Sequence, residues 1–348
     1  MQRDFEIDKY RGLVMAYIVC VIHAVYWLGL WHEPWRSYLL VEMPVIFFIS
    51  GAAHKMAREK RFGEFVLSKV KRVVIPYYIW GVLSLLMTVP VLYLCEPQLL
   101  DGIGGGRILR NVAKVFLFIE TANFIPKDAH TWFIFPFLVI MLLGYFAGKR
   151  LTTVRSIIIA CLILAVASLA ADYVMRVLGY RGWMMKQVSN VVVYGIFFLT
   201  GFLYKRVKAR IPMLIGGIAC IAIALCMMNG TQYPRSLQSC KFPVSFPFML
   251  YNLGTLAIMA FVFARIKLPD WKWLNTYNQR GFTIYLYQNW VFYAFHLLVF
   301  RYISAALPGW ITAAVTVASL FVLHLWLSRY FELIENWAAR HITRLLRT

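Results

Sequence analysis

A histidine, His23, lies inside the first long apolar segment of this chain. The segment runs from Arg11 to Trp31, reads RGLVMAYIVCVIHAVYWLGLW, and has about the ~20 residues that a bilayer crossing needs. An imidazole that titrates near neutral pH is costly in hydrocarbon, so it is expected to face a cavity, a partner or a reaction. The charged stretch DKYRG, from Asp8 to Gly12, stands just before it. This pattern suggests chemistry inside a membrane protein.

Two further side chains are candidates for the same chemistry. Glu42 lies in the outer part of the second apolar segment, where it could orient His23 or accept a proton, or could be an interfacial carboxylate. His130 opens the stretch HTWF at the outer mouth of the fourth segment. It could bind or activate an acceptor, or be an exposed loop histidine. No metal site is expected, because no carboxylate or second histidine stands at ligand spacing from the other intramembrane histidines, His54, His296 and His324.

The elements that must position these residues are membrane-spanning helices. The sequence is 61% hydrophobic and its mean hydropathy is +0.67, whereas a soluble domain is nearer half apolar. The fold class expected is all-α: a polytopic membrane protein with about ten transmembrane helices around a central cavity, in a single domain over residues 1–348. The expected spans are residues 12–31, 38–57, 73–94, 131–147, 154–174, 189–204, 211–228, 247–264, 282–300 and 311–328.

The net charge of +21 follows the expected topology. Alternate connections between the spans carry 25 of the 36 lysines and arginines, and the richer side is expected to be cytoplasmic. Both termini are therefore predicted to lie inside, in a multi-pass protein of the plasma (inner) membrane. The lipid bilayer is the expected partner, and no nucleic acid is expected because no basic soluble domain exists to bind it.

The six cysteines form no CxxC pair, so they carry no zinc or redox signature. Cys95 and Cys240 both fall on the predicted outer side. If that side is oxidising, a disulfide between them is expected.

Four segments, taken in order, resemble the acyltransferase-3 family of integral membrane acyltransferases, which modify sugars and other envelope molecules. Together with the ten-span topology, they extend the resemblance over nearly the whole chain. The segments are DKYRG followed by His23, MPVIFFISGAA (Met43 to Ala53), KRVVIPYYIW (Lys71 to Trp80) and HTWFIFPFLVI (His130 to Ile140).

The resemblance implies acyl transfer from cytoplasmic acyl-CoA, expected to be acetyl-CoA, to a hydroxyl of a saccharide or lipid-linked acceptor. His23 would be the general base, with Glu42 and His130 as further catalytic candidates. A group of basic residues would hold the phosphates of acyl-CoA. The part of this group from Lys69 to Arg72 could equally be an anchor that follows the positive-inside rule. That group is Arg11, Lys69, Lys71 and Arg72, and the expected substrate-binding residues are Trp132, Tyr285, Gln288 and Asn289. For the last three, ordinary hydrogen bonding between helices is the alternative.

The chain departs from the family pattern at two places. Eleven residues separate Arg11 from His23, where the family usually has ten. On a regular helix, eleven positions return to within ~20° of the same face and twelve positions land ~120° away. Either the two side chains lie on different faces, or a one-residue π-bulge restores the register. The second departure is YLYQN, from Tyr285 to Asn289, where Gln288 replaces the family's histidine and cannot shuttle protons.

The competing hypothesis is a transporter or flippase for an envelope precursor, without acyl-transfer activity. Such a protein is expected to distribute polar residues through both halves of a pathway and often contains an inverted repeat. No repeat is found in this sequence, and the polar residues concentrate near one histidine.

Overall fold

The computed structural model describes residues 4–54, 60–100, 104–121, 124–128, 130–180, 182–208, 211–230 and 233–345. Within these ranges the regular secondary structure is helical, and the one β-bridge is an isolated pair between Lys241 and Val244. The all-α fold class expected from the sequence is confirmed.

Eight helices within the described ranges are long and apolar enough to cross a membrane. Two further expected spans fall on α9 (Trp183–Gly201) and α13 (Lys272–Phe295), which are helical but carry more polar side chains. The prediction of about ten spans is therefore approximate. The eight candidates are Phe5–Trp27, Trp35–Ala53, Phe62–Cys95, Thr131–Arg150, Val154–Arg176, Ile211–Gly230, Phe246–Phe263 and Gly309–Ala338.

The chain divides into two compact units, and each takes stretches from both halves of the sequence. The first consists of Met1–Val14, Trp31–Phe62 and Pro136–Trp271. The second consists of Met15–Leu30, Gly63–Phe135 and Lys272–Thr348. That residues 1–348 behave as one domain stays a prediction.

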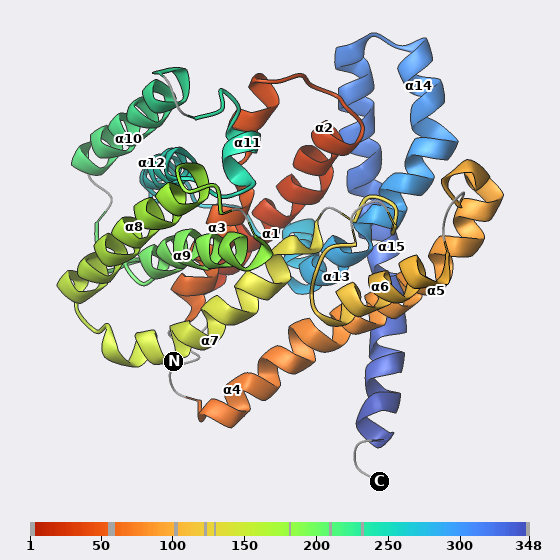
Figure 1. The fold of residues 1–348 in the computed structure, drawn as a ribbon, viewed down its shortest axis with the longest axis horizontal. Coiled ribbons are helices and arrows are strands. Elements are labelled where there is room, and N and C mark those ends of the chain that lie inside the picture. The colour runs from red at the N-terminus through yellow and green to blue at the C-terminus, as the bar shows by residue number, and fades with distance from the viewer. Residues whose placement is uncertain are drawn as a thin grey trace. The chain divides into compact units, whose positions relative to one another are not determined.

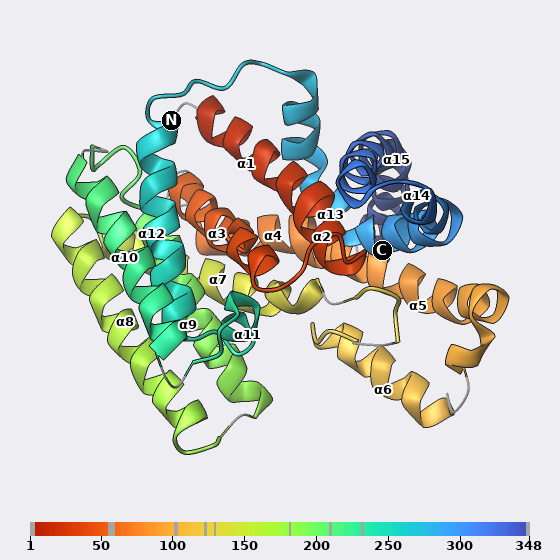
Figure 2. The ribbon, with the colours of Figure 1, turned by 90° about the horizontal axis from the view of Figure 1, so that it is seen from above.

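Helix pairs build the first unit, as Figure 2 shows for α8, α9, α10 and α12. The sequence patch SGAA permits the closest approach, because a side chain at Gly51 would overlap the carbonyl of Phe198 and one at Gly201 would overlap that of Phe48. The helices of this unit are α3 (Glu42–Ala53), α7 (Ile134–Arg150), α8 (Val154–Arg176), α9, α10 (Ile211–Gly230), α11 (Leu237–Lys241) and α12 (Phe246–Phe263).

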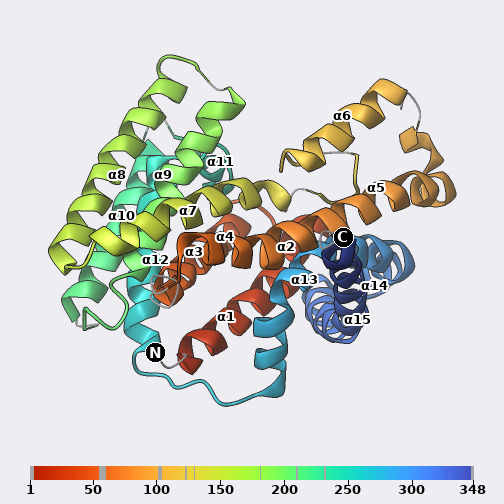
Figure 3. The same cartoon turned by 90° about the horizontal axis from the view of Figure 1, so that it is seen from below.

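In the second unit α13 packs along α15, and Figure 1 shows α14 returning into α15 as a hairpin. The helix α6 lies beside α5 in both Figure 2 and Figure 3. An apolar cluster joins α2, α13 and α15 and includes Ala24, Leu28, Phe292 and Leu320. His23, which precedes Ala24, is therefore held where these packed helices cross. The bounds are α2 (His23–Trp27), α4 (Phe62–Lys69), α5 (Ile75–Cys95), α6 (Gly105–Phe116), α13, α14 (Arg301–Ala306) and α15 (Gly309–Leu345).

A π-helical segment, Ile18–Ile22, separates α1 (Phe5–Tyr17) from α2. A π-bulge takes up one residue more than an α-helical turn. The extra residue between Arg11 and His23 allowed either side chains on different helix faces or a π-bulge that restores the register. The structure contains the π-helical segment. A second π-helical segment, Val70–Val74, joins α4 to α5.

The expected disulfide between Cys95 and Cys240 is absent, and both residues are free thiols. Cys240 is buried, with its Sγ 3.6 Å from the carbonyl oxygen of Pro234, whereas Cys95 is exposed at the end of α5. Cys95 belongs to the second unit and Cys240 to the first, so a disulfide between them stays a prediction.

Candidate active site

His23 is hydrogen-bonded to Gln288, a residue 265 positions away in sequence. His23 is the first residue of α2, and Gln288 is fully buried on α13. The ring Nδ1 lies 2.6 Å from Oε1 of Gln288. The amide nitrogen of Gln288 donates to the carbonyl oxygen of Tyr285 at 2.8 Å. Both ends of this amide therefore have a defined partner.

Aromatic rings surround the imidazole of His23. Trp27, one helical turn further along α2, stacks on it with ring centroids 4.4 Å apart and planes 7° from parallel. The rings of Tyr285 and His130 have centroids 5.8 Å and 6.4 Å from that of His23. His23 itself is half-buried, whereas His130 and Gln288 are buried.

His130 is buried, which corrects the alternative that it is an exposed loop histidine. Its side chain is hydrogen-bonded to α13, where Nε2 donates to the carbonyl oxygen of Leu286 at 3.2 Å. Tyr285 donates its hydroxyl to the carbonyl oxygen of His130 at 2.6 Å. Burial lowers the pKa of His130 to about 4, and the Leu286 carbonyl offsets only part of that shift. The ring is therefore neutral at physiological pH.

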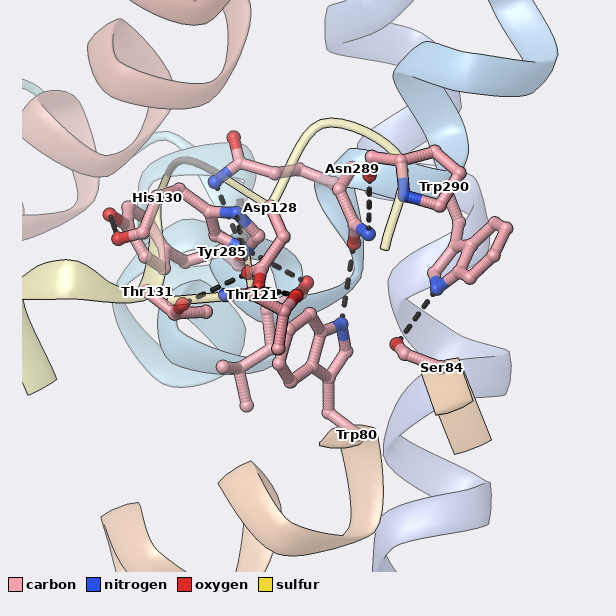
Figure 4. Close-up of polar contacts among 12 residues, drawn as sticks. Trp80, Ser84, Thr121, Asp128, His130, Thr131, Tyr285, Asn289 and Trp290 are labelled. Carbon is pink, nitrogen blue, oxygen red and sulfur yellow. Dashed lines mark hydrogen bonds and ion pairs between the residues drawn. The ribbon is translucent and has the colours of Figure 1, made fainter. Parts of the chain in front are cut away.

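Asp128 is a member of this cluster that the sequence did not single out (Figure 4). Its Oδ2 accepts from the backbone N–H and the hydroxyl of Thr121, at 2.9 Å and 2.5 Å. Its Oδ1 accepts from the Thr131 hydroxyl at 2.9 Å and lies 3.9 Å from Nδ1 of His130. Burial raises the pKa of Asp128 to about 6, although these hydrogen bonds oppose the shift. The one available signal was a carboxylate two residues before a candidate histidine.

Lys127 ties the same loop to the end of α2. Its Nζ donates to the carbonyl oxygen of Trp27 at 2.9 Å. A cation at this position satisfies one of the open carbonyls of the helix end and complements the helix dipole. Burial lowers the pKa of Lys127. The contact holds Trp27, whose ring covers His23.

The predicted substrate-binding residues use their polar groups within the protein. Asn289 accepts from Nε1 of Trp80 at 3.3 Å and donates to the carbonyl oxygen of Pro126 at 3.1 Å (Figure 4). Gln288 bonds to His23, and Tyr285 bonds to the carbonyl oxygen of His130. All three residues therefore form hydrogen bonds between elements, which was the alternative to a role in binding substrate. Trp132 is buried in the single turn Thr131–Phe133. A substrate role for these residues stays a prediction.

Two of the predicted site residues belong to the first unit, where each has an ionic partner. Glu42 is buried at the start of α3, and its Oε1 accepts from Nζ of Lys241 at 2.7 Å. Arg11 pairs with Asp8, with 3.1 Å between Nη1 and Oδ1. The catalytic role predicted for Glu42 and the cofactor role predicted for Arg11 stay predictions.

The other three predicted cofactor residues lie in the second unit, between α4 and α5. Lys69 ends α4 with its ammonium 5.4 Å from the centre of the Phe65 ring. Lys71 and Arg72 are exposed on the π-helical segment Val70–Val74. Exposed cations of this kind are available to a polyanion.

A metal centre finds no support among the described residues, because no group of three or more His, Cys, Asp or Glu side chains could hold an ion. The chemistry that the cluster offers is proton transfer and hydrogen bonding.

Comparison with known proteins gives one match. A family model described as an acyltransferase domain, of the acyltransferase-3 type, matches residues 4–329. No curated protein and no solved structure matches the chain significantly.

Proposed function

The chain belongs to the acyltransferase-3 family and is a multi-pass membrane acyltransferase, and from that premise we propose its donor, its acceptor and its base. The donor is cytoplasmic acyl-CoA, acetyl-CoA in particular. The acceptor is a hydroxyl group of an envelope saccharide or of a related lipid-linked molecule. The base is His23.

The observation that carries this proposal is the setting of His23. The residue is half-buried, and its ring is stacked on Trp27 and hydrogen-bonded through Nδ1 to a buried amide. His130, the other candidate base, is 1% exposed, and its low pKa makes it a weak proton acceptor. Of these two histidines, His23 is the one that combines partial exposure with a ring held by a hydrogen bond.

The reaction balances through a single proton. The imidazole of His23 removes the proton of the acceptor hydroxyl, and the oxygen attacks the carbonyl carbon of the thioester. When the tetrahedral intermediate collapses, the C–S bond breaks and the proton passes from the imidazolium to the thiolate of CoA. The products are the O-acyl ester and free CoA, and neither an oxidant nor a metal takes part.

The donor would bind on the cytoplasmic side. Lys71 and Arg72 are exposed beside Lys69, and these charges suit the phosphates of CoA. The same stretch lies on the side of the membrane that carries more lysines and arginines, which favours a cytoplasmic location. Both termini would then lie on the cytoplasmic side of the plasma (inner) membrane.

The proposal is tested with His23→Gln, which keeps a hydrogen-bonding side chain and removes the basic nitrogen. Membranes are supplied with acetyl-CoA labelled with ¹³C in the acetyl group, and label in the envelope saccharides is measured by mass spectrometry. Loss of a positioned base costs ~10²–10⁴ in rate, so labelling should fall by about that factor. His32→Gln, which changes an exposed histidine, is the matched control and should label normally.

The same assay tests the donor. With Lys71→Gln and Arg72→Gln combined, half-maximal labelling should need more acetyl-CoA, while the limiting rate stays close to that of the unmodified protein. Near-normal labelling by His23→Gln would show that the ring is structural. If the acceptor instead accumulates unmodified on the inner face when His23 is replaced, the flippase alternative is supported.

A further inference from the structure

The hydrogen bond between His23 and Gln288 decides which nitrogen of the imidazole is basic. We propose that Gln288 is a positioning residue that holds His23 as the Nδ1–H tautomer, so that Nε2 is the nitrogen that takes the acceptor proton. The assignment of Nε2 as the base rests on the proposed function, whereas the tautomer itself does not.

The orientation of the Gln288 amide follows from the atoms around it. The carbonyl oxygen of Tyr285 can only accept a hydrogen bond, so the amide end that faces it at 2.8 Å must be the NH₂ group. The other end, Oε1, therefore faces Nδ1 of His23 at 2.6 Å. Because Oε1 can only accept, the hydrogen must reside on Nδ1. A neutral imidazole with Nδ1–H carries its lone pair on Nε2.

Packing prevents the ring from escaping this arrangement. Trp27 lies flat against His23, and the Trp27 ring is itself held by an edge contact with Phe292, with centroids 5.0 Å apart. Gln288 is fully buried on α13, so no water competes for Oε1. A ring with a fixed plane and a fixed tautomer presents one nitrogen in one direction, which is what general-base catalysis requires.

An amide at this position orients the ring without adding a charge. Among the described residues, the rings of His130 and Tyr285 lie beside His23, Asp128 lies on the far side of His130, and Lys127 donates to the carbonyl oxygen of Trp27. His130 is neutral at physiological pH. The imidazolium formed during the reaction is stabilised by the Gln288 carbonyl dipole and by the face of Trp27. A histidine at position 288 could share protons with the base, whereas glutamine can only orient it.

The decisive variants are Gln288→Met and Gln288→Glu. Methionine has nearly the same size but no acceptor, so the tautomer is no longer specified and labelling should fall about ten- to hundredfold, as for other orienting partners. Glutamate keeps the acceptor and adds a charge, so activity should be largely retained at pH values above the acid limb of the pH–activity profile. Its carboxylate favours the imidazolium, so the acid limb of the pH–activity profile should move to higher pH by about 1–3 units. Gln279→Met, an exposed change on the same helix, is the control and should be neutral.

A double variant shows whether Gln288 acts through His23. If it does, Gln288→Met should cost nothing further in a protein that already carries His23→Gln. An additional loss would mean that Gln288 contacts the acceptor itself, and the inference would then fail. An unmoved acid limb in Gln288→Glu would also overturn it.

The tautomer can be read without any activity measurement. Solid-state ¹⁵N NMR of protein labelled at histidine, with His23→Gln used to assign the resonance, distinguishes a protonated Nδ1 from a protonated Nε2. We expect Nδ1–H in the native protein and a mixture in Gln288→Met. A native Nε2–H tautomer would overturn this inference and leave the acyltransferase proposal standing, whereas a fully active His23→Gln protein would overturn that proposal and leave the tautomer standing.

Discussion

At the scale of single residues, Asp128 and His130 respond to pH in opposite directions. The pKa of Asp128 is raised from 3.8 to about 6, so it stabilises the fold below pH 3.8 and this contribution is lost as the pH rises through 6. The pKa of His130 is lowered from 6.5 to about 4, so its contribution is present above pH 6.5 and is lost as the pH falls through 4. The two effects offset one another between pH 4 and 6, and only single variants separate them.

We therefore expect the stability advantage of the native protein over Asp128→Asn to decrease as the pH rises from 4 to 7. A shift of about two pKa units corresponds to a change on the order of 3 kcal/mol. The advantage over His130→Gln should change in the reverse direction. Thermal unfolding in detergent at several pH values measures both.

Gln279→Met serves as the control for that series, because it changes an exposed side chain and no titratable group, and it should leave the pH dependence unchanged. Parallel pH curves for the native protein and Asp128→Asn would show that the carboxyl group does not titrate differently on folding. That result would contradict the prediction that the contributions of Asp128 and His130 to stability change with pH in opposite directions.

At the scale of helices, small residues decide how closely α3 and α9 approach. Gly51 and Gly201 each leave room only for the backbone of the opposite helix. Such contacts replace the hydrophobic driving force that is missing between helices in lipid. Two adjacent glycines of α10 differ in how much room surrounds them. Gly217 faces the Gly254 carbonyl oxygen, whereas Gly216 faces open space.

We expect Gly201→Ala to destabilise the first unit by at least about 1–3 kcal/mol, because a methyl group would overlap the Phe48 carbonyl and the helices must separate. Gly216→Ala should be neutral or slightly stabilising, because alanine favours the helix and meets no neighbour. Unfolding temperature and the yield of monodisperse protein provide the comparison. Equal behaviour of the two variants would show that the α3–α9 contact tolerates separation.

At the scale of the whole molecule, charge orients the chain in the membrane. Of the 36 lysines and arginines, 25 lie on alternate connections between the expected spans. Both compact units draw on both halves of the chain, and the second includes Lys272–Thr348, so it can be completed only after the last span has inserted.

We expect both termini to be cytoplasmic. A C-terminal green fluorescent protein fusion should therefore fluoresce, and a C-terminal alkaline phosphatase fusion should be inactive, because the first folds inside and the second folds outside. A phosphatase fusion after residue 100, in the longest outer connection, is the positive control. An active C-terminal phosphatase would reverse the predicted orientation or change the number of spans by one.

Much of the molecule was predictable from the sequence alone. Hydropathy predicts an all-α multi-pass membrane protein, because a bilayer admits few alternatives to helices. His23 and His130 stand out because ionisable groups are costly in or beside apolar segments, and the patch at Gly51 predicts a close helix contact. Ordered motifs indicate the acyltransferase-3 family, which the match over residues 4–329 confirms.

Only the tertiary structure decided which side chains meet. Gln288 reaches His23 across 265 positions, Asn289 reaches Trp80 across 209, and no local pattern encodes such distances. Asp128 was overlooked because a carboxylate in a connection is ordinarily solvated, and only packing shows that this one is buried. The same holds for the tautomer of His23, because the proton position follows from the geometry of three polar groups that folding brings together.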